Sequence, residues 1–137
     1  NYCNTLISFF FPFILAAQAK AFKDNKIKNG TFYFRPNTDR ELIIIRNGSV
    51  QKEVFAGKKD TSVWRITWTN ASSYKLKFIR KDTAISQEEK SFYNVHIPLV
   101  RVLSVGNDYY IFTGDLDSIK GPGSITDTIW FKRQIKR

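Results

Sequence analysis

His96 is the only histidine of the chain and the first candidate for catalysis, because an imidazole can act as a base or as a metal ligand near neutral pH. No partner is placed beside it by the sequence, although catalysis by histidine requires one. Its neighbours Val95 and Ile97 are apolar, which predicts a strand in which they point to the opposite side from His96. The pattern therefore favours a structural or exposed histidine over a catalytic one.

Metal ligands are equally sparse. His96 alone cannot build a metal cluster, and no spaced set of oxygen ligands typical of a calcium loop occurs. Asp115 and Asp117 would share one face of a strand, and we interpret them as turn residues at its end. We predict neither a metal site, nor a cofactor, nor catalytic residues.

The hairpin predicted over residues 41–55 offers better candidates for a binding site, namely Arg46, Gln51 and Glu53. If Leu42 and Ile44 face the core, Arg46 does too, and a buried arginine needs an acceptor such as Glu53. The alternative is a cross-strand ion pair on the surface, which the usual exposure of charged residues favours.

Three aromatic residues could complete such a site: Trp64, Trp68 and Tyr74. Inside a small barrel, they and the polar cluster would bind one modest apolar or amphipathic ligand. Core packing is the default alternative, in which the same aromatic side chains fill the interior.

The charge balance is strongly basic, with 22 Lys and Arg against 12 Asp and Glu and a net charge of +10. Such a surface attracts polyanions, but the basic residues form no recognisable nucleic-acid motif, so specific nucleic-acid binding is not expected. Arg65, Lys75 and Lys77 fall on one face of a predicted hairpin. This basic surface suits an anionic envelope polymer, lipid headgroups or an exported protein partner.

The start of the chain reads as an export signal. Residues 1–19 carry no charge and contain the apolar run 6–17, followed by the small-residue site Ala17-Gln18-Ala19. The run is shorter than the about 20 residues needed to span a bilayer, although an uncleaved anchor or a buried helix remains the alternative. The chain begins with Asn and lacks Met, so we expect a truncated start.

Cleavage would leave residues 20–137 as a single domain in the periplasm or outside the cell. A domain of this size buries roughly two-thirds of its unfolded surface, enough for a hydrophobic core. It contains no cysteine, because Cys3 precedes the predicted cleavage site, so no disulfide can form within it.

The domain is predicted to be all-β, because short runs rich in β-branched and aromatic residues alternate with turn residues. Eight candidate strands span 31–35, 41–46, 50–55, 62–69, 74–80, 92–105, 108–116 and 126–133. Short connections favour an antiparallel meander, curled or closed into a small barrel, with a two-sheet sandwich as the alternative.

Turn residues fix several connections. Asn47-Gly48 and Gly106-Asn107 are typical of tight hairpins. Pro98 predicts a bulge, break or edge inside the sixth run. Ser86 and Glu89 have the spacing of a capping box, so the connection 81–91 is expected to hold one helical turn or a solvated loop. Gly121-Pro122-Gly123 would mark a second long connection.

The fourth and fifth strands are predicted to form the central hairpin around residues 70–73. Three cross-strand pairs would anchor the core: Trp64 with Phe78, Ile66 with Leu76, and Trp68 with Tyr74. On its opposite face Arg65 would lie across from Lys77.

The domain resembles a group of small exported Bacteroidota proteins that are commonly left as hypothetical. The resemblance lies in Lys28-Asn29-Gly30-Thr31-Phe32-Tyr33, in Ile45-Arg46-Asn47-Gly48 with Gln51 and Glu53, and in Ile66-Thr67-Trp68 with Tyr74-Lys75-Leu76. Members often carry two cysteines, one near the mature start and one before the residue matching Tyr74. This chain has neither, so the family's disulfide is absent. Some relatives are labelled DNA topoisomerase by automatic transfer, which export and small size argue against.

Gly30-Thr31-Phe32 also resembles the glycine-x-tryptophan start of lipocalin-like barrels, with Arg133 as its packing partner. This similarity implies an architecture and not descent.

These observations predict an exported, non-enzymatic binding protein that uses a barrel interior or a basic surface. The alternatives are a small secreted hydrolase using His96 and carboxylates, and an envelope inhibitor or assembly factor.

Overall fold

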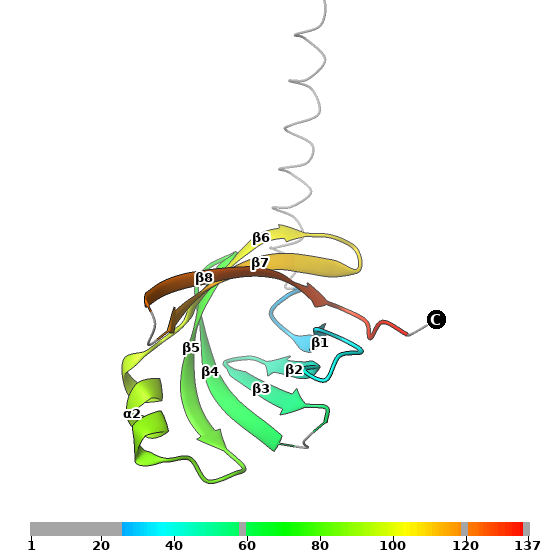
Figure 1. Cartoon of the computed structure of the whole chain (residues 1–137). Helices are drawn as coiled ribbons and strands as arrows, with labels where there is room; N and C mark the ends of the chain where they lie inside the picture. The colour runs from blue at the N-terminus through cyan, green and yellow to red at the C-terminus, as the bar shows by residue number, and fades with distance from the viewer. Residues whose placement is uncertain (1–25, 58–59, 119–120, 136–137) are drawn as a thin grey trace, which may run out of the picture.

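Eight antiparallel strands close into a barrel in the computed structural model, which describes residues 26–57, 60–118 and 121–135 (Figure 1). Each strand pairs with the next along the chain, and β8 returns to β1. The strands are β1 (Gly30–Phe34), β2 (Leu42–Asn47), β3 (Val50–Phe55), β4 (Asp60–Asn70), β5 (Ser73–Lys81), β6 (Leu99–Val105), β7 (Tyr109–Ser118) and β8 (Gly121–Trp130). One described helix, α2 (Gln87–Val95), lies between β5 and β6 in the chain. The predicted all-β meander is confirmed as a barrel, and the sandwich alternative is wrong; the predicted signal segment lies outside the described residues.

The core forms where alternate residues of each strand point inward, as the two-residue period of a strand requires. The buried cluster draws on seven of the eight strands and on the segment before β1. It consists of Ile27, Phe32, Ile44, Ile66, Tyr74, Leu76, Val100, Val102, Tyr110, Phe112 and Ile129. Leu42 and Trp64 pack against it from β2 and β4.

The central hairpin follows its predicted register, whereas the β2–β3 turn lies one residue later than predicted. Asn47 still pairs with Val50, so the turn residues are Gly48 and Ser49, and Gly48 takes the positive φ of 60° that glycine tolerates best. In the β4–β5 hairpin Trp64 pairs with Phe78, and Arg65 with Lys77. The pairs Ile66 with Leu76 and Trp68 with Tyr74 are also present.

The prediction of a single strand over 92–105 is wrong in its first half. Residues 92–95 belong to α2, which begins after Ser86, whose hydroxyl accepts a hydrogen bond from the Glu89 N–H at 3.1 Å. The capping residues thus start a helix of 9 residues, longer than the single turn expected. Pro98 follows the helix, and β6 begins only after it, as the predicted break requires.

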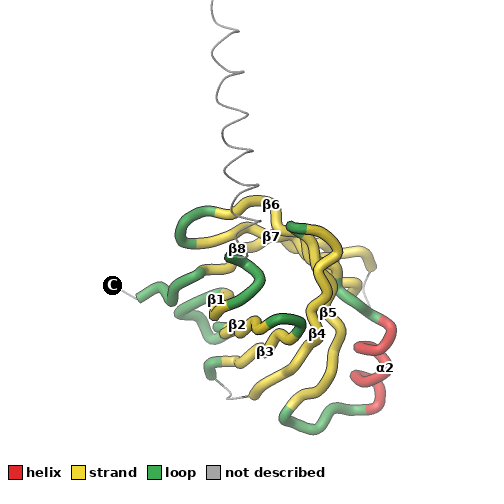
Figure 2. Tube along the Cα trace, turned by 180° about the vertical axis from the view of Figure 1, so that it is seen from behind, coloured by secondary structure: helices red, strands yellow, loops and turns green. Residues whose placement is uncertain are grey.

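The helix is held beside β5, outside the main ring of strands (Figure 2). Only three residue pairs, from Ser73–Arg101 to Lys75–Leu99, join β5 to β6. Beyond them, Tyr93 of α2 stacks on Phe78 at 4.4 Å. Aromatic packing therefore outweighed the β-rich composition of this segment.

The last hairpin also differs from prediction. Residues 121–123, expected in a long connection, belong to β8 and pair with the end of β7, Pro122 opposite Asp117. Pro122 is tolerated there because β1 pairs with β8 only at Ile129 and Trp130, which leaves one edge of β8 unpaired at Pro122. The strand ends at Trp130, not at the predicted residue 133.

The barrel closes through a short seam. Phe34 pairs with Ile129 facing the interior, and Tyr33 pairs with Trp130 facing outward. Tyr109 of β7 packs against the outer Trp130 at 5.0 Å. Side-chain packing on both faces therefore reinforces a seam of only two registered pairs.

The segment after β8 is tied to the β1–β2 connection. Arg133 forms an ion pair of 2.9 Å with the buried carboxylate of Glu41, and Asn37 donates a hydrogen bond to the Gln134 carbonyl at 2.6 Å. Arg133, which the resemblance to lipocalin-like barrels pairs with Gly30-Thr31-Phe32, thus contacts Glu41 in the connection between β1 and β2.

Candidate functional site

Arg46 lies inside the barrel with only 2% of its surface exposed. Its guanidinium donates three hydrogen bonds: Nε to Gln51 Oε1 at 2.8 Å, Nη1 to the Ile27 carbonyl at 2.7 Å, and Nη2 to the Tyr74 hydroxyl at 2.7 Å. The interpretation as a surface ion pair is wrong, and Glu53 is not its direct acceptor. The inward face of β2 required Arg46 to be buried, and neutral oxygens around it supply the partners.

Aromatic rings surround this buried cation. Its guanidinium carbon lies 4.9 Å from the ring centre of Phe32, 4.7 Å from Tyr74 and 5.8 Å from Tyr110. Burial works to lower the pKa of Arg46, but the phenol oxygens of Tyr110 and Tyr74 more than offset it, so the pKa lies above its ordinary value. The guanidinium therefore stays charged inside the barrel.

A short relay joins Arg46 to a carboxyl group. Gln51, 1% exposed, accepts from Arg46 and donates through Nε2 to Glu53 Oε1 at 2.7 Å. Burial raises the pKa of Glu53, while the Gln51 hydrogen bond and the charge of Arg46 pull it down less strongly. The carboxyl of Glu53 is thus held closer to its neutral form than an exposed glutamate.

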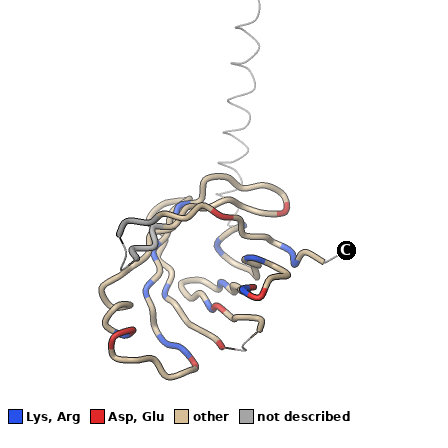
Figure 3. The backbone as a smooth tube through the Cα atoms, viewed as in Figure 1, with Lys and Arg blue, Asp and Glu red and all other residues tan. Residues whose placement is uncertain are grey.

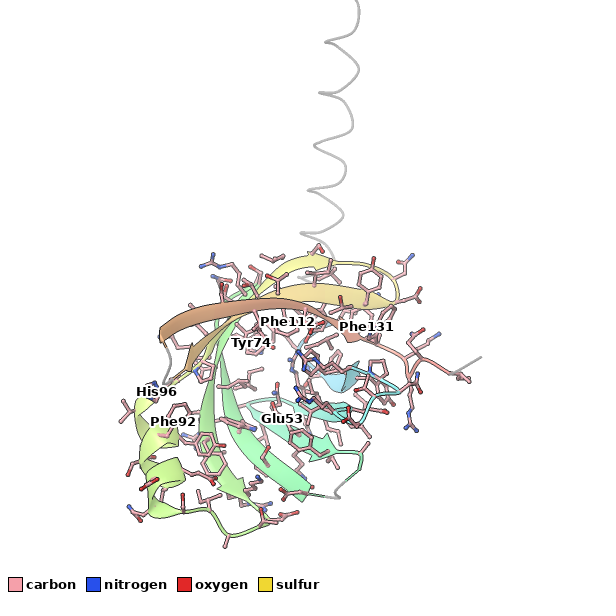
Figure 4. The ribbon with its side chains drawn as sticks, in the orientation of Figure 1. Glu53, Tyr74, Phe92, His96, Phe112 and Phe131 are labelled. Atoms are coloured by element: carbon pink, nitrogen blue, oxygen red, sulfur yellow. The ribbon has the colours of Figure 1, made fainter. Side chains whose placement is uncertain are left out.

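An interior cavity of about 240 Å³ adjoins this polar relay. Glu53 and Tyr74 lie on the inner side of the barrel wall (Figure 4). The polar lining residues come from β2 and β3, and apolar side chains supply most of the remaining wall. The full lining comprises Phe34, Leu42, Ile44, Arg46, Gln51, Glu53, Trp64, Tyr74, Leu76, Pro98, Val100, Phe112, Gly114, Ile125 and Ile129.

Five of the six predicted pocket residues line the cavity, and Trp68 does not. Trp68 is half-buried, packs on Tyr74 at 4.7 Å, and carries Lys28 5.2 Å from its ring centre. Trp64 does line the cavity and donates to the Ser62 hydroxyl at 3.0 Å. The aromatic residues therefore divide between the cavity wall and the adjoining core.

Sequence reasoning missed two kinds of residue at this site. Phe112, Ile125 and Ile129 line the cavity from β7 and β8. The even spacing of Ile125 and Ile129, which puts both on one face of a strand, was a signal that could have found the last two. The Ile27 carbonyl and the Tyr110 ring complete the Arg46 environment. Ile27 precedes β1, so no strand pattern places it there.

The predicted basic surface lies on the outside of the barrel. Arg65, Lys75 and Lys77 are all exposed, and the first and last lie opposite each other in the β4–β5 register. These residues are separated from the cavity by the barrel wall, because their neighbours Trp64 and Leu76 point inward to line it.

His96 is not in a strand but follows α2 as its C-cap. Its ring packs on Phe92 at 4.3 Å, and Figure 4 shows it at the outer edge of the molecule, away from Glu53. Asp115 and Asp117 belong to the last part of β7. Within the described ranges, no group of three or more His, Cys, Asp or Glu residues is arranged to hold a metal ion.

Comparison of the chain with models of known families, with curated proteins and with solved structures gave no match. None of the helices in the described part of the chain has the length and apolar character required to cross a bilayer.

Proposed function

We propose that this protein is an exported, non-enzymatic binding protein that holds one small amphipathic ligand inside its barrel. The observation that carries the proposal is an apolar cavity with a buried, hydrogen-bonded polar relay on one wall. Pockets that bind small molecules combine a mostly apolar lining with a few polar groups that orient the ligand.

The cavity volume limits the size of the ligand. An apolar cavity of about 150 Å³ accommodates benzene, with its six carbon atoms. Scaled in proportion, the cavity of about 240 Å³ would accept about ten nonhydrogen atoms. The proposed ligand is therefore a small molecule with a short hydrocarbon body, not a long lipid.

The polar end of this ligand would face Glu53. Arg46 already donates to three neighbours, and Gln51 links it to Glu53. A half-buried carboxyl whose pKa is raised by burial can donate when neutral and accept when ionised. A hydroxyl group, which can do both, is the simplest complement, as in an aliphatic alcohol.

The test combines native mass spectrometry of the purified protein with thermal unfolding in the presence of 1-octanol. We expect either a bound small molecule that denaturation releases, or a rise in Tm with octanol in the emptied protein. Gly114 lines the cavity, and a Cβ added there would lie at ordinary contact distances of 3.8 Å from Phe112 and 4.0 Å from Val100. Gly114→Leu should therefore fill the cavity and abolish both effects.

Thr113→Leu is the matched control, because Thr113 is the adjacent residue of β7 and points to the opposite side. It should bind as the wild type does. The proposal fails if the wild type yields neither a bound molecule nor an octanol response, or if Gly114→Leu and Thr113→Leu respond equally.

The predicted hydrolase alternative has no comparable geometric support. His96 lies beside α2 at the outer edge, whereas the Glu53 carboxyl faces the interior. The inhibitor or assembly-factor alternative would use the outer surface of the barrel.

A further inference from the structure

The outer face of β3 to β6 carries a group of exposed cations that we call the basic face: Lys52, Arg65, Lys75, Lys77 and Arg101. Figure 3 shows Lys and Arg residues spaced along β4 and β5 (Figure 3). Arg65 and Lys77 are directly opposed in the sheet, an arrangement of like charges that destabilises a strand pair. The fold therefore maintains repulsion on this face.

Among the side chains that the structure describes, no carboxylate forms an ion pair with a residue of the basic face. The ion pairs given for those side chains lie elsewhere and join Arg35 to Asp127, Arg80 to Asp82, Lys81 to Asp60, and Arg133 to Glu41. The outward positions of β4 and β5 near Arg65 and Lys77 carry Thr67 and Lys75 instead of acidic residues. An external anion would supply the missing counter-charge.

Exposed aliphatic side chains border the same cations. Leu103, 47% exposed, follows Arg101 by two residues in β6. Ile97, 45% exposed, lies near Lys77, because the Leu76 N–H donates to the Pro98 carbonyl at 3.1 Å. A dissolved polyanion gains little from aliphatic contacts, whereas a bilayer interface offers both anionic headgroups and an apolar layer beneath them.

We propose that the basic face docks the barrel on the surface of an anionic lipid bilayer. The cations contact the headgroup phosphates, and Ile97 and Leu103 enter the interface beside them. This placement leaves the barrel outside the hydrocarbon layer, and it does not depend on whether the cavity holds a ligand.

The test is co-sedimentation of the protein with vesicles of phosphatidylcholine alone or mixed with phosphatidylglycerol. We expect the mixed vesicles to bind more protein than phosphatidylcholine alone, and this excess to weaken as salt rises. One basic residue near an anionic surface changes the partition coefficient about fivefold, so Lys75→Gln with Lys77→Gln should weaken binding about 25-fold. Ile97→Ser with Leu103→Ser should weaken it at unchanged net charge.

Arg40→Gln with Lys132→Gln is the matched control. Both residues are exposed and lie outside the basic face, and the two substitutions remove the same charge as Lys75→Gln with Lys77→Gln. All variants retain residues 1–25, so any contribution of that segment cancels, and circular dichroism checks their folding. A much smaller loss in the control supports docking through the basic face. Equal losses in the two charge variants overturn it.

A second outcome also overturns the proposal. In this outcome, the variant with Ile97→Ser and Leu103→Ser binds vesicles as the wild type does. In addition, dissolved polyglutamate binds the wild type, and Lys75→Gln with Lys77→Gln abolishes that binding. The basic face would then recognise a soluble polyanion and not a bilayer.

Discussion

At the scale of single residues, the unusual feature is a buried arginine that is linked to a carboxyl group through another side chain. Arg46 contacts Gln51, and Gln51 contacts Glu53. Burying a charge costs free energy unless hydrogen bonds and an opposite charge compensate it. Here three hydrogen bonds and aromatic rings stabilise the cation, and Glu53 remains available at the cavity wall.

Glu53→Gln should make stability less sensitive to pH. The pKa of Glu53 is raised in the folded state above its ordinary value of 4.5, so the folded protein binds more protons than the unfolded chain between these two values. The stabilisation from this group is complete below the unfolded pKa and is lost as pH rises through the folded pKa. Glutamine cannot ionise, yet its side-chain oxygen can still accept from Gln51.

Denaturant unfolding measured from pH 4 to 8 checks this prediction. The free energy of unfolding of Glu53→Gln should increase relative to that of the wild type as pH rises over that range. Parallel pH profiles for the two proteins would contradict a raised Glu53 pKa. Glu88→Gln, at an exposed position of α2, is the control and should leave the profile nearly unchanged.

At the scale of elements, α2 compensates for an incomplete wall. The β5–β6 pairing covers only residues 73–75 of β5, and Tyr93 packs against Phe78 and Trp64 farther along. No residue of α2 is fully buried, so a few aromatic contacts hold the helix. Its position matters for the cavity because Trp64 also forms part of the cavity lining.

Tyr93→Ala should release α2 from the barrel. Tyr93 is half-buried, so we expect a loss of about 2 kcal/mol in the free energy of unfolding, below the ~3–5 kcal/mol typical of fully buried large aromatics. Urea unfolding measures this loss, and hydrogen exchange of α2 amides should accelerate more than that of β4. Asn94→Ala, at an exposed position of the same helix, should change stability little. Similar small effects of both substitutions would contradict the packing role of Tyr93.

At the scale of the whole molecule, a net charge of +10 is concentrated on a small barrel. Like charges repel one another within a compact state, and salt screens that repulsion. Two of the four ion pairs given above, Arg35 with Asp127 and Arg80 with Asp82, are largely open to solvent and contribute little in water. Repulsion should therefore outweigh attraction at low ionic strength.

Raising NaCl from about 0.01 to about 0.15 M, which shortens the screening length from ~30 to ~8 Å, should raise the Tm of the protein. Differential scanning calorimetry measures this change. The Lys75→Gln and Lys77→Gln variant carries less repulsion and should show a smaller rise. A fall of Tm with salt in the wild type would mean that surface ion pairs dominate.

Local patterns in the sequence were enough to predict most of the strands, the register of the β4–β5 hairpin and the inward face of β2. Alternation with a period of two places Trp64, Ile66 and Trp68 on one side of β4, and Gly48 marks the β2–β3 turn to within one residue. These features depend on residues close together in the chain. The same local reasoning identified Arg46, Gln51 and Glu53 as a cluster.

Only the tertiary structure decided the closure of the barrel, the helix in place of the first half of a strand, and the hollow interior. Closure joins Phe34 to Ile129, residues far apart in the chain, and α2 is held by Tyr93 against β4 and β5. A cavity is what remains after side chains from every strand have packed, so no single segment encodes it. For the same reason, the burial of Arg46 depended on the Ile27 carbonyl and the Tyr74 hydroxyl, which only the closed barrel brings to it.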